Sequence, residues 1–169
     1  MKLEKNFENY LNNTDLVPVQ YDDSQEGMYK IRFNSVVSQE QFARIKEFLH
    51  IKPEIRFWVC VDGHKKHELR SSEEFASCEG DTIVIAMPHF RAFYNIYELI
   101  KSFGVKIEGA KIGDGEIAYE YKLKGRSVLN YDELGQIQDE VDPTVSNHNS
   151  CRQMGCGGEY TLNIRFDRK

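Results

Sequence analysis

The amino-acid sequence predicts an α+β fold in which two main helices pack on a mixed β-sheet. Apolar residues recur at helical spacing over residues 39–50 and 90–103, and short runs of β-branched and aromatic residues lie between these segments. A length of 169 residues with 40% hydrophobic residues fits one domain with an ordinary core. We therefore expect a single domain over residues 1–169, built as a sheet with helices on it.

The N-terminal third begins with a helix and a hairpin. Residues 2–13 carry Leu3, Phe7, Tyr10 and Leu11 at helical spacing, which predicts an amphipathic helix. Residues 17–22 and 28–34 are short and rich in β-branched or aromatic side chains, and a polar segment ending in glycine separates them. This pattern predicts two strands that pair as a hairpin.

A capping box marks the start of the first main helix. Ser38 and Gln41 have the spacing at which each side chain bonds the other's backbone N–H, and an apolar stripe then continues to residue 50. Pro53 ends this helix, and residues 54–61 (EIRFWVCV) predict a buried strand.

The middle of the chain predicts a strand and the second main helix. Residues 82–87 (TIVIAM) form a continuous apolar run between an aspartate and a proline, as expected for a buried strand. Residues 90–103 are apolar nearly all round, and Gly104 is the residue type favoured just after a helix end. A helix of this kind is either deeply buried or covered on one face by a partner.

The C-terminal third predicts a hairpin, a short helix and a last strand. Residues 105–112 and 116–123 flank a Gly-Asp-Gly turn, which is typical of a hairpin. Residues 131–140 predict a helix, residues 142–158 predict a flexible loop because they are polar and glycine-rich, and residues 159–166 predict a strand.

A degenerate α/β solenoid is the alternative architecture. Strands flanked by helical segments recur about every 25 residues, as in repeat proteins. The repeat is irregular and no asparagine returns at a fixed place, so a mixed sheet is the simpler interpretation.

The spacing of apolar residues within the expected helices and strands predicts the core. It should contain Phe42, Ile45, Phe48, Phe57, Val59, Ile83, Ile85, Ile96, Leu99, Ile100 and Ile107.

The overall charge excludes some partners. A net charge of −5 and a pI of about 5.6 argue against direct binding to nucleic acid or to an anionic membrane, because phosphate backbones attract clustered Lys and Arg. No apolar run approaches the ~18 residues of a membrane span, and no signal-peptide pattern follows Met1. We therefore expect a cytoplasmic protein whose cysteines stay reduced.

Most cysteines and histidines fall into two short clusters at residues 60–67 and 148–156. Thiolate and imidazole bind zinc, and a structural zinc site usually takes four ligands from two pairs. The sequence is interpreted as having no cofactor and incidental cysteines, and a zinc site formed by these two clusters is the alternative. The candidate ligands are Cys60, His64, His67, His148, Cys151 and Cys156.

Cysteine chemistry is a second use of the same residues. Cys151 stands next to Arg152, whose charge favours a thiolate, and His148 is a candidate base. The common nucleotide-binding and hydrolase motifs do not occur in the sequence. The sequence therefore leans away from an enzyme, with Cys151 and His148 as the alternative catalytic pair.

The acidic run near residues 132–142 and several tyrosines predict binding to a basic protein. Carboxylates speed capture of a positively charged partner, and tyrosine is a favoured buried anchor. The residues expected to take part are Asp139, Glu140, Asp142, Tyr94, Tyr97 and Tyr131.

The preferred function is that of a small acidic cytosolic protein which acts by binding another protein. An inhibitor or immunity protein for a basic toxin or nuclease is its concrete form. The alternative is a zinc-binding protein or a cysteine-dependent enzyme that uses the two Cys/His clusters. The sequence does not predict the oligomeric state.

Overall fold

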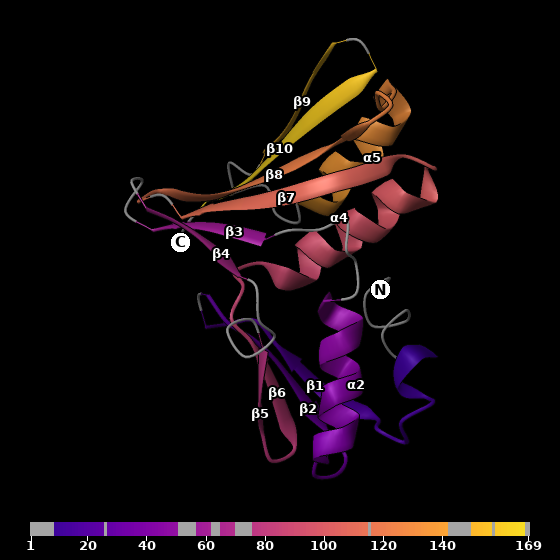
Figure 1. Cartoon of the computed structure of the whole chain (residues 1–169), viewed down its shortest axis with the longest axis vertical. Coiled ribbons are helices and arrows are strands. Elements are labelled where there is room, and N and C mark those ends of the chain that lie inside the picture. Colours follow the sequence, from indigo (N-terminus) through magenta and orange to yellow (C-terminus); the bar gives the residue numbers. More distant parts are fainter. Residues whose placement is uncertain are drawn as a thin grey trace. The chain divides into compact units, whose positions relative to one another are not determined.

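The chain folds as two units, each containing one β-sheet and helices, and this confirms the α+β class (Figure 1). The computed structural model describes residues 9–25, 27–50, 57–61, 65–69, 76–114, 116–141, 150–156 and 158–167. Within these residues the strands form two sheets instead of the single mixed sheet expected, and they do not form a solenoid. Unit 1 comprises Met1–Lys52 and Ser71–Asn95, and unit 2 comprises Pro53–Arg70 and Ile96–Lys169.

Unit 1 contains a four-stranded antiparallel sheet in the order β1-β2-β6-β5. The predicted hairpin is confirmed, because its two strands pair directly, and the apolar run at residues 82–87 supplies another strand. The inward face of this sheet is apolar, and Tyr29, Ile31 and Ile83 are almost completely buried. The strands are β1 (Pro18–Asp22), β2 (Tyr29–Phe33), β5 (Ala76–Glu79) and β6 (Thr82–Ile85).

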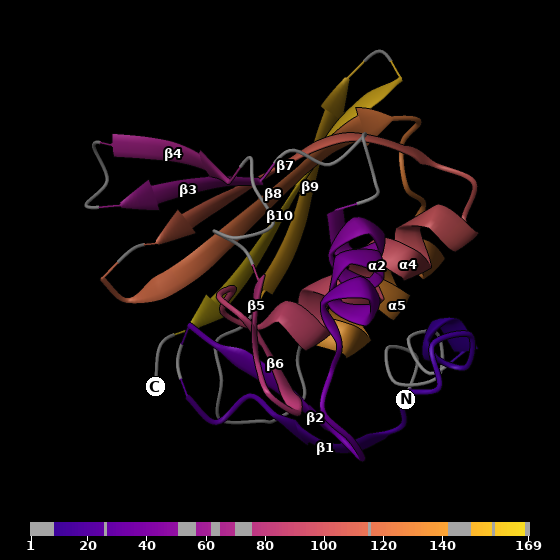
Figure 2. The ribbon, with the colours of Figure 1, turned by 60° about the horizontal axis from the view of Figure 1, so that its bottom comes forward.

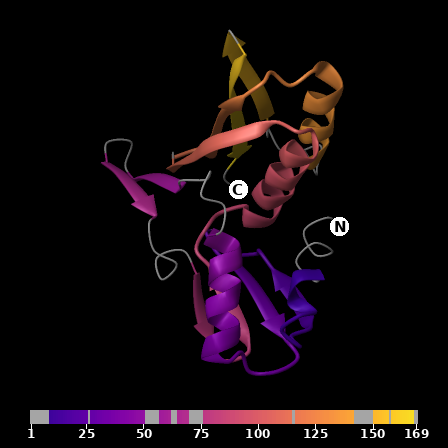
Figure 3. The ribbon, with the colours of Figure 1, turned by 45° about the vertical axis from the view of Figure 1, so that its right-hand side comes forward.

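Helix α2 (Gln39–His50) covers the four-stranded sheet (Figure 3), and its start confirms the predicted capping box. Gln41 N donates to Ser38 Oγ over 3.1 Å, and Ser38 N donates to Gln41 Oε1 over 2.9 Å. These two bonds satisfy N–H groups that the first turn of any helix leaves without partners. The helix then buries Ile45 and Leu49.

A row of six aromatic rings runs through unit 1. Consecutive ring centroids are between 4.1 and 6.2 Å apart, so each ring packs against the next. The guanidinium of Arg91 lies 6.0 Å from the ring centroid at one end of the row. In order, the rings belong to Tyr10, Phe48, Tyr94, Phe90, Tyr29 and Tyr21, so the row links α2 and the first half of the next helix to the sheet.

Unit 2 contains a six-stranded mixed sheet in the order β4-β3-β7-β8-β10-β9 (Figure 2). Strands β3 and β7 are parallel, and every other neighbouring pair is antiparallel. The expected hairpin of residues 105–112 and 116–123 is confirmed as β7–β8. The strands are β3 (Phe57–Val61), β4 (Lys65–Leu69), β7 (Lys106–Asp114), β8 (Ala118–Arg126), β9 (Ser150–Cys156) and β10 (Glu159–Asp167).

Helices α4 (Phe90–Ser102) and α5 (Tyr131–Val141) confirm two further predictions. The end of α4 is followed by Gly104 with φ of 76°, the left-handed conformation that glycine adopts readily. Helix α4 begins in unit 1 and ends in unit 2. Its second half and α5 lie on the same side of the six-stranded sheet (Figures 1 and 3). The side chains of β8 and β10 alternate accordingly between buried and more exposed positions.

The loop expected over residues 142–158 is wrong from residue 150 onward, because Ser150–Cys156 forms β9. Cys156 pairs directly with Glu159, and the sequence between them is Gly-Gly, a known hairpin signal. Residues 142–149 lie outside the described residues, as does most of the expected helix over 2–13, of which residues 9–11 are helical.

The core prediction is largely confirmed. Ile45, Ile83, Ile85, Ile96, Leu99, Ile100 and Ile107 are all buried. Phe42 and Phe48 are only half-buried, because they lie toward the edges of the apolar stripe of α2. The side chains of Phe57 and Val59 lie outside the described part of the structure.

Candidate interaction surfaces

Cys151, the expected nucleophile, is a half-buried free thiol in β9. Its backbone N–H donates to Gln138 Oε1 over 3.0 Å, and burial raises the pKa of its thiol to about 11. A thiolate is the reactive form of cysteine, so this environment favours the protonated and less reactive form. The proposed partner His148 lies outside the described residues.

The two cysteines expected to share a zinc ion lie on one extended strand. Cys151 and Cys156 are five residues apart in β9, a span of roughly 16 Å at the rise of a β-strand. That separation is too great for one zinc ion or for a disulfide, whose Cα atoms lie within about 7 Å. Among the described residues no group of three or more His, Cys, Asp or Glu side chains could hold a metal ion.

The remaining members of the candidate zinc site are placed only by their backbone or not at all. Cys60 pairs with Lys66, and His67 with Val59, in the β3–β4 ladder. His64 and His148 lie outside the part of the chain that is described. A zinc site that uses these residues therefore stays a prediction from the sequence.

We expect alkaline pH to destabilise the protein through Cys151. A thiol with a folded pKa of about 11 against an ordinary 9.0 contributes stability below pH 9 that is lost as pH rises toward 11, because the unfolded chain releases its proton first. By pH 10 the loss should be about 1 kcal/mol, after allowance for partial exposure. Chemical denaturation at pH 7, 9 and 10 should therefore show a flatter pH dependence in Cys151→Ala.

The matched control is Cys78→Ala. Burial and the nearby Asp81 and Glu79 raise the pKa of the Cys78 thiol too, so this second free thiol acts in the same direction. If Cys78→Ala flattened the pH dependence of the free energy of unfolding and Cys151→Ala left it unchanged, Cys151 would not be the source of the alkaline destabilisation.

Helix α5 is held firmly on its inner side. Asn130 and Glu133 form a second capping box at its start, with two bonds of 2.9 Å. Ile137 is fully buried in the middle of the helix. Gln153 of β9 bonds both the N–H and the C=O of Leu129 just before the helix, at 2.9 and 3.1 Å. These contacts fix the direction in which the outer face of α5 points.

The outer face of α5 is acidic. Asp132, Gln136 and Asp139 are exposed and lie at helical spacing, and Glu140 is half-buried beside them. None of the three carboxylates forms an ion pair with another described residue. Asp139 and Glu140 stand in the last turn, where the helix dipole disfavours negative charge and where α5 has no basic residue. Asp142 lies outside the described residues.

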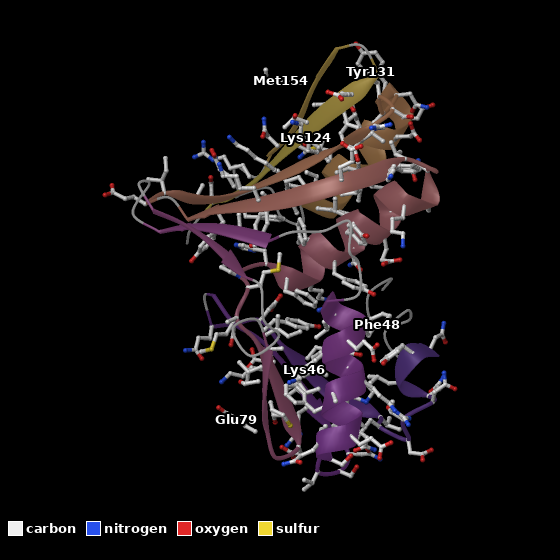
Figure 4. The ribbon with its side chains drawn as sticks, in the orientation of Figure 1. Lys46, Phe48, Glu79, Lys124, Tyr131 and Met154 are labelled. Atoms are coloured by element: carbon white, nitrogen blue, oxygen red, sulfur yellow. The ribbon has the colours of Figure 1, made fainter. Side chains whose placement is uncertain are left out.

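The structure separates the three tyrosines expected to anchor a partner. Tyr131 begins α5 with 92% of its surface exposed, whereas Tyr94 and Tyr97 are 7% and 2% exposed. Tyr94 packs between the rings of Phe48 and Phe90. Tyr94 and Tyr97 therefore serve the core in this structure, and Tyr131 is the tyrosine that a partner can reach (Figure 4).

The face of the six-stranded sheet opposite α5 is basic at its centre. Lys122, Lys124 and Arg126 occupy alternate exposed positions of β8, and Figure 4 labels Lys124 on this strand. Across the β7–β8 ladder Lys111 stands directly opposite Lys122, and Lys106 directly opposite Arg126. The net charge of the whole chain does not reveal this face, because the face arises from the alternation of side chains within each strand.

Neutral and acidic residues set the limits of this basic face. On β10, Thr161 and Asn163 stand opposite Lys124 and Lys122. The carboxylate of Glu108 accepts a hydrogen bond from Arg126 over 2.7 Å. Glu120 precedes Lys122 by two positions on the same face of β8. The centre of the face is thus a small group of lysines with neutral neighbours on one side.

In the described part of the chain no helix is long and apolar enough to cross a membrane. Comparison with known proteins identifies no relative: no protein-family model, no curated protein and no solved structure matches this chain.

Proposed function

We propose that this protein acts by binding a basic protein through the outer face of α5. The observation that supports this most strongly is the placement of Tyr131, which is 92% exposed at the start of a helix whose other side is fixed by hydrogen bonds and buried residues. A large, stiff and amphipathic side chain on a rigid support loses little entropy on binding. The carboxylates along the same face would attract a positively charged partner.

The last turn of α5 gives a second reason. Asp139 and Glu140 stand where negative charge weakens a helix, and among the described residues no cation compensates them. Residues that break a local stability rule are found most often where function requires them. A basic partner surface would supply the missing positive charge.

In its concrete form the proposal is an inhibitor or immunity protein that works in the cytoplasm and covers the basic surface of a toxin or nuclease. The acidic face of α5 would speed the encounter, and Tyr131 would fill a pocket on the partner. A zinc-dependent or cysteine-dependent activity gains no support from the burial of Cys151 or from its distance to Cys156.

The test uses charge reversal and truncation on α5. After a partner has been isolated from the native host and purified, Tyr131→Ala should weaken binding by about 2 kcal/mol or more, roughly 30-fold. The double variant Asp139→Lys with Glu140→Lys should mainly slow association, and added salt should have the same effect on the wild type. The same double variant should unfold with a free energy about 0.3–1 kcal/mol higher, because the new charges suit the helix dipole.

Glu79→Lys provides the matched control, because Glu79 is an exposed carboxylate in unit 1 (Figure 4). This change should leave the association rate close to that of the wild type. A partner that binds Tyr131→Ala and the α5 double variant as well as it binds the wild type would refute the proposal.

A further inference from the structure

The basic face of the six-stranded sheet has a complement in the chain itself. We propose that this face, centred on Lys122 and Lys124, is a docking site for the acidic face of α5 of a second copy. The inference shares that α5 face with the proposed function but adds a different surface and a different partner. It rests on charge, on spacing and on the position of the two surfaces within unit 2.

The centre of this sheet face and the end of α5 carry opposite charges. Lys122 and Lys124 are exposed on β8, and the residues directly opposite them on β10 carry no charge. Asp139 and Glu140 lie at the end of α5, where negative charge is unfavourable. Contact with the two lysines would bring positive charge to this end of α5.

The charge spacings of the two surfaces differ by about 4 Å, a difference that long lysine side chains can span. Lys122 and Lys124 are about 6.7 Å apart along the strand, and the next strand lies about 5 Å away. On α5 the carboxylates of Asp132 and Asp139 are separated by two turns, about 10.5 Å along the axis. A helix laid on the sheet would thus bring its carboxylates within reach of the long, exposed lysine side chains.

The limits of the basic face favour a helix over a long polyanion. Glu120 lies on one side of the lysine pair along β8, and Glu108 pairs with Arg126 toward the other end. A nucleic-acid strand that crossed the sheet would meet these carboxylates, whereas a two-turn acidic helix covers only the centre. The net charge of −5 also disfavours a nucleic-acid partner.

The contact must form between copies. In unit 2, α5 lies against the buried face of the sheet and is joined to β9 through Gln138 and Gln153, while Lys122 and Lys124 point to the opposite face. The two surfaces of one chain therefore cannot meet. An interface between different surfaces of identical copies is heterologous, and it forms closed rings or open chains of molecules. Such assembly would hide α5 and compete with binding of the basic partner.

The experiment uses sedimentation velocity on two charge-reversed variants. The wild type should associate as its concentration rises at low salt and return to the monomer at high salt. Lys122→Glu with Lys124→Glu, and separately Asp132→Lys with Asp139→Lys, should each raise the self-dissociation constant about tenfold or more. An equimolar mixture of the two variants should associate more tightly than either variant alone, because each charged surface of one variant then meets a surface of opposite charge on the other.

The matched control is Lys30→Glu with Arg32→Glu, which reverses two basic residues at alternate positions of β2 in unit 1. This control should associate like the wild type. A wild type that stays monomeric at low salt, or a mixture of variants that fails to pair, would overturn the inference. Binding of a labelled oligonucleotide that only the Lys122 and Lys124 reversal abolishes, without self-association, would overturn it in favour of nucleic acid.

The same variants distinguish self-association through the sheet face from binding of a basic partner through α5. Reversal of Lys122 and Lys124 should weaken self-association about tenfold or more but leave binding of the basic partner intact. Reversal of Asp132 and Asp139 should weaken both. Loss of partner binding in the lysine variant would contradict the separate role of the sheet face, whereas self-association without any partner would contradict the proposed function alone.

Discussion

Replacing Gly125 by alanine is expected to lower the free energy of unfolding by about 3 kcal/mol. Gly125 lies on β8 directly opposite Tyr160 of β10. A Cβ atom there would overlap the backbone carbonyl oxygen of Lys106 and would lie 2.7 Å from the Tyr160 ring. The carbonyl belongs to the β7–β8 ladder and the ring is buried, so neither can move without disturbing the sheet. Urea denaturation followed by far-ultraviolet circular dichroism measures the change.

Gly135→Ala is the matched control for this substitution. Gly135 lies on the exposed side of α5, and a Cβ there would meet no atom within 4 Å apart from its chain neighbours and the backbone of α5 itself. Alanine is a better helix former than glycine, so this change should raise the free energy of unfolding by about 0.5–1 kcal/mol. Equal effects of the two substitutions would contradict the close approach described for Gly125.

Truncation of Tyr29 to alanine should lower the free energy of unfolding by about 3–5 kcal/mol, whereas Tyr29→Phe should be neutral or slightly stabilising. The ring is 1% exposed and packs against the rings of Tyr21 and Phe90 in the aromatic row. Its hydroxyl is buried without a hydrogen-bond partner among the described residues, and burial raises the pKa of this group far above its usual value. Phenylalanine keeps the packing and removes the unsatisfied hydroxyl.

Thermal unfolding of the wild type, Tyr29→Ala and Tyr29→Phe, followed by near-ultraviolet circular dichroism, measures these differences in stability. The sole tryptophan of the chain, Trp58, belongs to β3 in unit 2, so its signal does not report on unit 1. If Tyr29→Phe lowered the free energy of unfolding by about 1 kcal/mol or more, the Tyr29 hydroxyl would have a hydrogen-bond partner and the prediction would be wrong.

Local patterns in the sequence predicted most of the elements. The capping box at Ser38 and Gln41 marked the start of α2, and Gly104 marked the end of α4, because these signals act over a few residues. β9 was missed because the polar residues of Ser150–Cys156 resemble a loop and only pairing with β10 makes them a strand. The Gly-Gly pair that follows was the available signal.

The two sheets and the candidate surfaces depend on contacts that no local pattern reveals. β3 meets β7 across about fifty residues, and β2 meets β6 over a similar separation, so the sorting of strands between sheets could not be deduced. The tyrosines of α4 had the composition of an interface, but the aromatic row placed Tyr94 in the core. The basic face arose from register, since Lys111 and Lys122 become neighbours only when β7 and β8 pair.

The division of the chain into units made of interrupted segments bears on how the protein is synthesised. Each unit is assembled from two stretches of sequence, and β3 and β4 lie between the two halves of unit 1. During translation β3 leaves the ribosome well before its parallel partner β7. The edge of β3 that pairs with β7 therefore stays unpaired while β5 and β6 complete the sheet of unit 1. A nascent chain that stalls after residue 95 would therefore expose β3, and chaperones that bind exposed strands would find their target there.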